Sequence, residues 1–208
     1  MPLPRPARPL PVTSVEVDGE DWVGRVIDGE VYDGVLFREV DLTDVVTRGA
    51  MFTDCVFRDV RLNGSRHTAS AFLNCAFDRT TLFGATFTEC KLVGSWFDRS
   101  TFARLTVEGG DWSMAGLAGA DLGTARLVGV RMRETDLTDL RGVEAVLRDV
   151  DLTGAWTHGA DLSRADLRGS DLSTIDVTTT VLTGARVGVQ QAVQLAESLG
   201  VEVDVDAG

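Results

Sequence analysis

Residues 160–173 read ADLSRADLRGSDLS, in which a leucine recurs at every fifth position. The same spacing extends from Trp22 to Val187. Of the 34 positions reached in steps of five, 30 carry a large apolar side chain. A period of five matches neither the 3.6 residues of a helical turn nor the two-residue alternation of a strand. The pattern therefore predicts a solenoid, in which short units stack into a continuous core.

A second position repeats with the first. Two residues before each apolar centre the side chain is small (Ala, Ser, Thr, Cys, Val or Gly) in 28 of the 34 cases, as at Ala50, Cys75 and Ala165. One large and one small side chain pointing inward fill a narrow core. The other three positions of each unit are expected to face water.

The charge composition of the chain indicates which classes of partner it can bind. The chain has 32 acidic and 20 basic residues, a net charge of -12, and Lys91 is its only lysine. This balance argues against direct binding to nucleic acid or to an anionic membrane. No apolar run approaches the roughly 18 residues of a membrane span. The N-terminus lacks the apolar segment of a secretory signal, so a cytoplasmic location is expected.

Three regions are predicted. All five prolines lie in the first eleven residues, so residues 1–14 are expected to be a flexible proline-rich tail. Residues 15–187 form the repeat region. Residues 188–208 are expected to form a short helix followed by a strand over 201–206, which cap the solenoid and join two copies. The apolar face of the helix, and hence the predicted dimer contact, comprises Val189, Ala192, Val193, Ala196 and Leu199.

The runs at 160–173, 115–127 (AGLAGADLGTARL) and 55–62 (CVFRDVRL) resemble pentapeptide repeats of the A(D/N)LXX type. This resemblance covers about residues 20–187. It implies an all-β fold, a right-handed quadrilateral parallel β-helix in which four pentapeptides make one coil of 20 residues, with a short C-terminal helix.

That geometry predicts specific contacts, because residues 20 apart then stack on neighbouring coils at about 4.8 Å. Six phenylalanines are expected in two internal columns: Phe37, Phe57, Phe77 and Phe97 in one, Phe52 and Phe72 in the other. The polar centres Thr47 and His67 are expected to hydrogen-bond. Gly142 leaves a hole that Leu140 is expected to fill, with a local bulge in the backbone.

The sequence offers little for catalysis. His67 occupies a core position and His158 an outward one, and there is no phosphate-binding glycine motif or metal-ligand spacing. We therefore expect no enzyme, no cofactor and no metal. The acidity is concentrated in residues 105–208, with 17 acidic and 8 basic residues, against 15 and 12 in residues 1–104. The candidate partner-binding residues on two acidic sides are Asp111, Asp151 and Asp171 on one, and Asp136, Asp139 and Asp176 on the other.

Residues 48–97 and 182–200 (LTGARVGVQQAVQLAESLG) resemble the mycobacterial fluoroquinolone-resistance members of the family. This resemblance implies a homodimer joined through the C-terminal helices that mimics duplex DNA, binds DNA gyrase, inhibits supercoiling and protects against quinolones. Two other interpretations stay open. One is a self-immunity or scaffold protein for a different protein partner, and the other is a binder of ice or mineral, which would need a longer outward threonine ladder.

Overall fold

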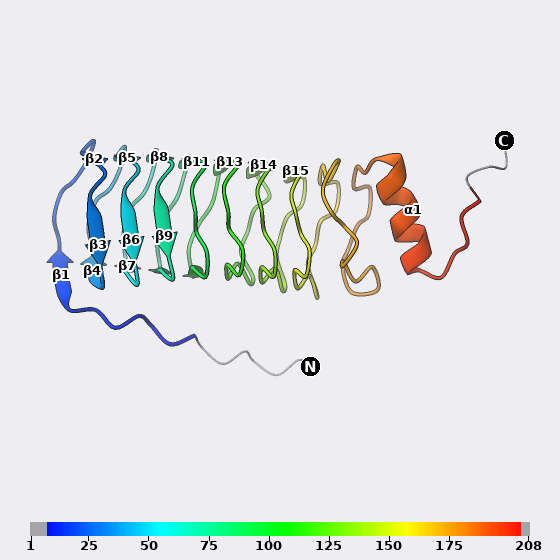
Figure 1. The fold of residues 1–208 in the computed structure, drawn as a ribbon, viewed down its shortest axis with the longest axis horizontal. Coiled ribbons are helices and arrows are strands. Elements are labelled where there is room, and N and C mark those ends of the chain that lie inside the picture. The colour runs from blue at the N-terminus through cyan, green and yellow to red at the C-terminus, as the bar shows by residue number, and fades with distance from the viewer. Residues whose placement is uncertain (1–7, 205–208) are drawn as a thin grey trace.

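The computed structural model describes residues 8–204, and these form a rod of stacked coils with one helix at its C-terminal end (Figure 1). The chain is a parallel β-solenoid, so the predicted fold class is confirmed. Paired residues on neighbouring coils are 20 positions apart, as in Phe37 with Phe57 and Thr47 with His67. Each coil therefore consists of four five-residue units.

Each side of the rod is a ladder of short parallel segments. One sheet contains β1 (Val15–Asp18), β4 (Val35–Arg38), β7 (Val56–Arg58), β10 (Ala76–Asp78) and β12 (Trp96–Asp98). A second contains β2 (Val26–Asp28), β5 (Val46–Arg48), β8 (Arg66–Thr68), β11 (Thr86–Thr88), β13 (Thr106–Glu108), β14 (Arg126–Val128) and β15 (Val146–Arg148). A third contains β3 (Val31–Asp33), β6 (Met51–Thr53) and β9 (Ala71–Leu73). Isolated bridges such as Asp41 with Arg61 form the fourth side and continue the ladders toward the C-terminus.

The predicted phenylalanine columns are confirmed. Phe37, Phe57, Phe77 and Phe97 stack in nearly parallel pairs with ring centroids 4.9, 4.8 and 4.6 Å apart. Phe52 and Phe72 stack at 4.7 Å. The column continues through buried Leu117 and Leu137. Rings stacked at the spacing of paired strands fill the N-terminal half of the core, so a smaller side chain there would leave a cavity.

The irregular core position at Gly142 is filled from two directions. A Cβ added to Gly142 would lie 2.8 Å from Leu162 Cδ2 and 3.5 Å from Leu140 Cδ2. The expected displacement of apolar volume to Leu140 is thus observed. The expected bulge is not, because Arg141 pairs with Asp121 and Asp161 in the regular register. The two leucine side chains fill the space, so the backbone does not have to move.

The two ends of the rod are covered differently. Residues 1–7 of the predicted flexible tail lie outside the described residues. Residues 8–14 turn back along the rod, with the Ser14 amide donating to Gly34 O at 2.8 Å and an Arg8 Nη1 contact to Met114 O at 3.5 Å. At the other end α1 (Val189–Ser198) covers the last coil. Residues 201–204 form no strand, and the rest of the strand predicted over 201–206 lies outside the described residues. After α1 the Val201 amide donates to Ala196 O at 3.1 Å, which closes the turn at the end of the helix.

Candidate functional site

The aspartate that precedes an apolar centre has a structural role. Its Oδ1 accepts a hydrogen bond from the backbone amide two residues later, as in Asp111 to Ser113 at 3.0 Å and Asp171 to Ser173 at 2.9 Å. The same contact occurs at Asp21, Asp41, Asp121, Asp136, Asp151, Asp161, Asp166 and Asp176. Oδ1 thus closes the turn in each of these units, which gives the aspartates a role within the coil itself.

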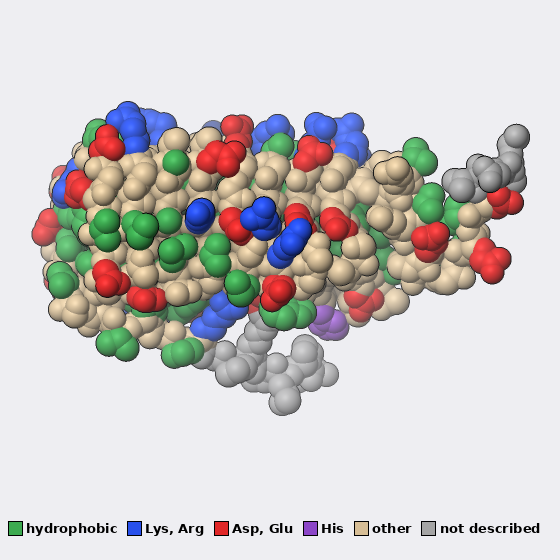
Figure 2. Space-filling model, viewed as in Figure 1, with side chains coloured by type: hydrophobic (Ala, Val, Ile, Leu, Met, Phe, Trp, Pro, Cys, Tyr) green, Lys and Arg blue, Asp and Glu red, His purple; other side chains and the backbone are tan. Residues whose placement is uncertain are grey.

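Three of the predicted partner-binding residues share one ladder. Asp111, Arg131, Asp151 and Asp171 are bridged in that order on successive coils, and Lys91 precedes them. We call these five residues the β3 ladder, because they extend the side that begins with β3. Arg131 Nη1 lies 2.9 Å from Asp111 Oδ2, and Arg133 Nε lies 2.5 Å from Asp151 Oδ2. The predicted acidic side is therefore one in which acidic and basic groups alternate, as along the middle of the rod in Figure 2.

These carboxylates stay ionised near neutral pH. Burial raises the pKa of Asp151, but hydrogen bonds from Thr153 and Arg133 outweigh it and the pKa is lowered. A hydrogen bond from the side chain of Ser173 lowers the pKa of Asp171. Asp171 Oδ2 also accepts from Thr153 Oγ1 at 3.2 Å, so its charge is not neutralised by a cation there. Among the three, Asp171 retains the most available negative charge.

Asp136, Asp139 and Asp176, the second predicted acidic side, do not form one continuous exposed surface. Asp136 is only 2% exposed, which removes it from any exposed acidic surface. Asp139 occupies an exposed corner, with a left-handed φ of 55°. Asp176 is exposed and accepts from Thr178 Oγ1 at 2.5 Å and Thr179 Oγ1 at 3.0 Å. A hydrogen bond from Thr178 lowers its pKa, so it remains charged.

Corner positions supply acidic groups that the sequence prediction omitted. Glu134 and Asp149 are exposed and adopt φ of 51° and 54°. The corners of a coil project furthest from the core, and their side chains are free of the turn-closing role. A search at the second residue after each apolar centre would have found them from the five-residue spacing alone.

The terminal helix has two distinct faces. Gln191 is buried, and its Nε2 donates to Leu167 O and Ser170 O, both at 2.7 Å. Its Oε1 accepts from Gly188 N at 2.6 Å and Gly169 N at 3.2 Å. Leu195 packs against the core beside it. Gln191 and Leu195 thus cover the open end of the solenoid, where backbone groups have no next coil to pair with.

The predicted dimer residues lie on the other face. Val189 is 81% exposed and Leu199 62% exposed, and Ala192 is exposed as well. Val193 and Ala196 are half-buried. An apolar helix face is therefore left uncovered at the end of the rod. The sequence prediction found this face but not Gln191, because a polar residue in a helix gives no apolar signal.

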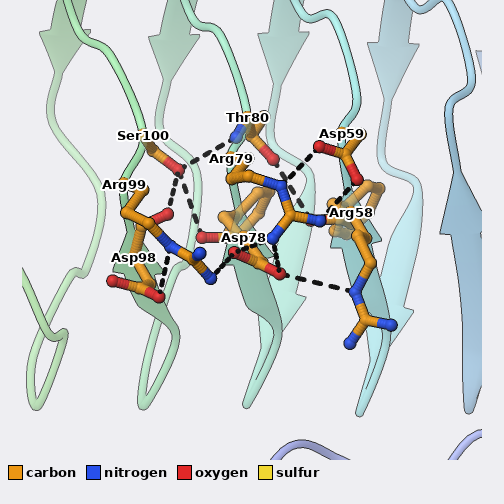
Figure 3. A network of polar contacts seen from close by, with 10 residues as sticks. Arg58, Asp59, Asp78, Arg79, Thr80, Asp98, Arg99 and Ser100 are labelled. Atoms are coloured by element: carbon orange, nitrogen blue, oxygen red, sulfur yellow. Dashed lines mark hydrogen bonds and ion pairs between the residues drawn. The ribbon is translucent and has the colours of Figure 1, made fainter.

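A second group that the sequence analysis did not identify lies in the N-terminal half. Figure 3 shows arginines and aspartates alternating across neighbouring strands around Asp78, which is buried. Asp78 carboxylate oxygens contact Arg99 at 2.6 Å, Arg79 at 3.1 Å and Arg58 at 3.4 Å. Arg79 also pairs with Asp59 at 2.6 Å. Buried charge that is this well paired ties three coils together rather than offering a free anion site.

Chemistry at the histidines is limited by their surroundings. His67 Nδ1 lies 2.9 Å from Thr47 Oγ1, as predicted, and its Nε2 lies 2.9 Å from Ser65 Oγ. Burial lowers the pKa of His67 to about 3.

Within residues 8–204 no group of His, Cys, Asp and Glu has the arrangement of a metal site. No helix in that same range is long and apolar enough to cross a membrane.

Comparison with known families identifies the repeat. Residues 145–184 match the family model for pentapeptide repeats, in eight copies. The chain contains pentapeptide repeats. The structure extends the same 20-residue coil toward the N-terminus, where strand pairing begins at Val15. A search of curated protein sequences found no match.

One solved structure shows the same fold, and a second pentapeptide repeat protein matches more weakly. Full-length QnrB1, described as a plasmid-mediated fluoroquinolone resistance protein, matches with a TM-score of 0.51 and 19% identity, over 91% of this chain and 99% of that one. HetL, a pentapeptide repeat protein involved in heterocyst differentiation regulation from the cyanobacterium Nostoc sp. strain PCC 7120, matches with a TM-score of 0.37 and 16% identity, over 85% and 87%. At these identities the likeness concerns the fold alone.

Proposed function

We propose that the chain is a non-enzymatic DNA mimic that binds DNA gyrase as a homodimer, inhibits supercoiling and protects against quinolones. The observation that carries the proposal is the combination of a stacked rod with an acidic C-terminal half and an exposed apolar helix face at that same end. The resemblance of residues 48–97 and 182–200 to fluoroquinolone-resistance members of the family supports this proposal.

The dimer would place the acidic halves together. If the faces around Val189 and Leu199 of two copies meet, the two C-terminal halves lie at the centre of a longer rod. Residues 105–208 carry 17 acidic and 8 basic residues, so each copy contributes a net -9 there. A protein surface that binds duplex DNA meets one phosphate charge about every 1.7 Å of axis. A rod with its charge concentrated near the centre competes for such a groove.

The six candidate aspartates differ in how much free charge they offer to gyrase. Asp111 and Asp151 are paired with arginines, and Asp136 is buried. Asp171, Asp176 and the corner residue Asp139 are therefore the stronger candidates. Exposed charges on one rod act over about 8 to 10 Å at physiological salt, so their loss reduces binding most where they are grouped.

A gyrase supercoiling assay, with and without a quinolone, tests the proposal. Asp139→Asn, Asp171→Asn and Asp176→Asn together remove three charges, and asparagine keeps the side-chain oxygen that closes the turn at positions 171 and 176. We expect this triple variant to inhibit gyrase at least tenfold more weakly than the unmodified chain. A matched triple variant in the N-terminal half, Asp18→Asn, Asp28→Asn and Asp33→Asn, should inhibit normally.

Two results would overturn the proposal. One is the absence of both inhibition and quinolone protection by the unmodified dimer at micromolar concentration. The other is an inhibition that does not weaken as salt is raised, because an electrostatic mimic is screened by salt. A pull-down that recovers other proteins and no topoisomerase subunit would favour a scaffold or self-immunity role.

A further inference from the structure

The N-terminal segment follows one edge of the rod. Val12 O lies beside Gly34, where an added Cβ would be 3.3 Å away, and Arg8 reaches Met114 and Gly116. Gly34 and Met114 are 80 residues apart, which is four coils of 20 or about 19 Å along the axis. The six steps between the seven residues from Ser14 to Arg8 cover about the same length at the 3.1 Å rise of polyproline II. The segment is therefore extended and runs along the rod (Figure 1).

The sheet next to this edge of the rod has apolar residues at its outward positions. Val56 and Ala76 alternate with inward-facing residues and so point outward, yet both are buried, at 2% and 0% exposed. Trp96 follows them in the same ladder and is half-buried. Gly116 comes next, and an added Cβ there would lie 2.9 Å from Trp96 Cβ and 3.4 Å from Arg8 Nη1. The absence of a side chain at 116 admits both the indole and the arginine.

The contact between the segment and the rod is loose. A cavity of about 500 Å³ remains between them, lined on the rod by Asp54, Asn74, Gly94 and Trp96. Leu10 is 43% exposed although it faces this cavity, and Val12 is 91% exposed. A core segment would be close-packed, whereas a docked peptide keeps part of its surface in water. Proline-rich segments dock in this way into grooves lined by aromatic residues, because their extended backbone is already ordered.

We propose that the edge of the rod formed by Asp54, Asn74, Gly94 and Trp96 is a binding groove for extended, proline-rich peptides, and that residues 8–12 are its resident occupant. Leu10 is the apolar anchor between Pro9 and Pro11, and Arg8 extends the contact to Met114. Because residues 8–12 are covalently joined to the rod, their effective concentration beside the groove is high. The segment therefore blocks other ligands. A partner protein with a proline-rich segment of this kind would have to displace it.

Nuclear magnetic resonance of the full chain tests this. The indole N–H resonance of Trp96 is assigned with Trp96→Phe. Leu10→Asp places a charge at the anchor and should release the segment, which shifts that resonance. The buried indoles of Trp22 and Trp112 should not move. Val12→Asp is the matched control, because the same charge on the exposed side chain two residues away should leave the Trp96 resonance in place.

A synthetic peptide of residues 8–14 (RPLPVTS) then tests recognition in trans. Added to the Leu10→Asp chain, it should return the Trp96 resonance toward its original position with a dissociation constant on the order of millimolar, as expected for a short linker-free ligand. The unmodified chain, whose groove is occupied, should bind at least tenfold more weakly. An unshifted Trp96 resonance in Leu10→Asp would overturn the proposal, and so would equal binding to both chains or no binding to either.

Discussion

Thr47 and His67, which lie 20 residues apart, share a buried hydrogen bond of 2.9 Å on adjacent coils. Ser65 Oγ donates to Leu62 O at 2.7 Å, so it accepts from His67 Nε2, and Nδ1 is left to accept from Thr47. The ring also stacks on Phe87 at 4.5 Å. A neutral imidazole with its proton on Nε2 meets all of these contacts, and burial disfavours the charged form.

The free energy of unfolding should therefore depend on pH through His67. Its folded pKa is about 3, below the ordinary 6.5, because burial disfavours the charged form. Below 6.5 the unfolded chain binds a proton that the folded chain does not, so acid favours unfolding. His67 should make stability fall by about 1.4 kcal/mol per pH unit below this value. Urea unfolding from pH 7 down to about 5 measures this slope.

His67→Phe should reduce that slope by the contribution of one proton, and the Thr47 hydroxyl keeps Ser70 as a partner at 2.8 Å. Removal of the exposed His158 as His158→Gln is the comparison for a surface histidine. Equal slopes in His67→Phe and the unmodified chain would contradict the assignment of a neutral, buried ring.

Phe77→Ala should be strongly destabilising. Phe77 is fully buried and stacks between Phe57 and Phe97, so its removal leaves a cavity in the centre of a column. We expect the free energy of unfolding to fall by about 3 to 5 kcal/mol. Phe83→Ala, which removes the same ring from an exposed position, should cost less than about 0.5 kcal/mol. A loss below about 1 kcal/mol at Phe77 would show that the ring is not part of the core.

Gln191→Met should destabilise the C-terminal coil. Methionine retains the length of the side chain but leaves Leu167 O, Ser170 O and Gly188 N without their partner. Buried backbone groups without partners cost about 1 to 3 kcal/mol each, reduced where water enters, so we expect a loss of about 2 to 3 kcal/mol. Hydrogen exchange should show faster opening near residues 167–170. The exposed neighbour Gln194, changed to Met, should leave both measurements unaltered.

Val189→Glu with Leu199→Glu should give a monomer that keeps its fold. Both side chains lie on the exposed face of α1, away from Gln191 and Leu195, so the cap of the last coil remains intact. Sedimentation should show the loss of the dimer, and circular dichroism should be unchanged. Gln190→Glu adds a charge at an exposed position next to Val189 and should remain dimeric. A double variant that still sediments as a dimer would place the dimer contact elsewhere.

The double variant distinguishes two roles of the C-terminal helix, covering the last coil and forming the dimer. A truncation would remove both roles at once. Removal of the chain after Arg186 would also delete Gln191 and so uncover the last coil. Loss of gyrase inhibition in such a truncation could come from unfolding of the end. Loss of inhibition in the folded double variant would come from the monomer itself.

The five-residue pattern predicted the positions of the acidic residues but not their ion pairs or their burial. The register correctly placed Asp111, Asp151 and Asp171 on one ladder, because residues 20 apart stack. It did not show that arginines at 131 and 133 reach two of these aspartates, since side-chain direction is not part of the period. Nor did it indicate that Asp136 would be buried.

The position of the N-terminal segment could be predicted even less from the sequence. Five prolines without an apolar period indicate an extended chain, and extension is what residues 8–14 show. Whether such a chain lies on the rod depends on Trp96 and Gly116, about 90 residues later in the sequence.

The sequence by itself determined the coil: the five-residue period sets which residues face inward and which residues stack, and this rule needs only local geometry repeated along the chain. The tertiary structure alone decided which carboxylates stay free, which face of α1 covers the last coil and where the N-terminal segment lies. Those outcomes depend on contacts between side chains from different coils, whose directions and neighbours no local period specifies.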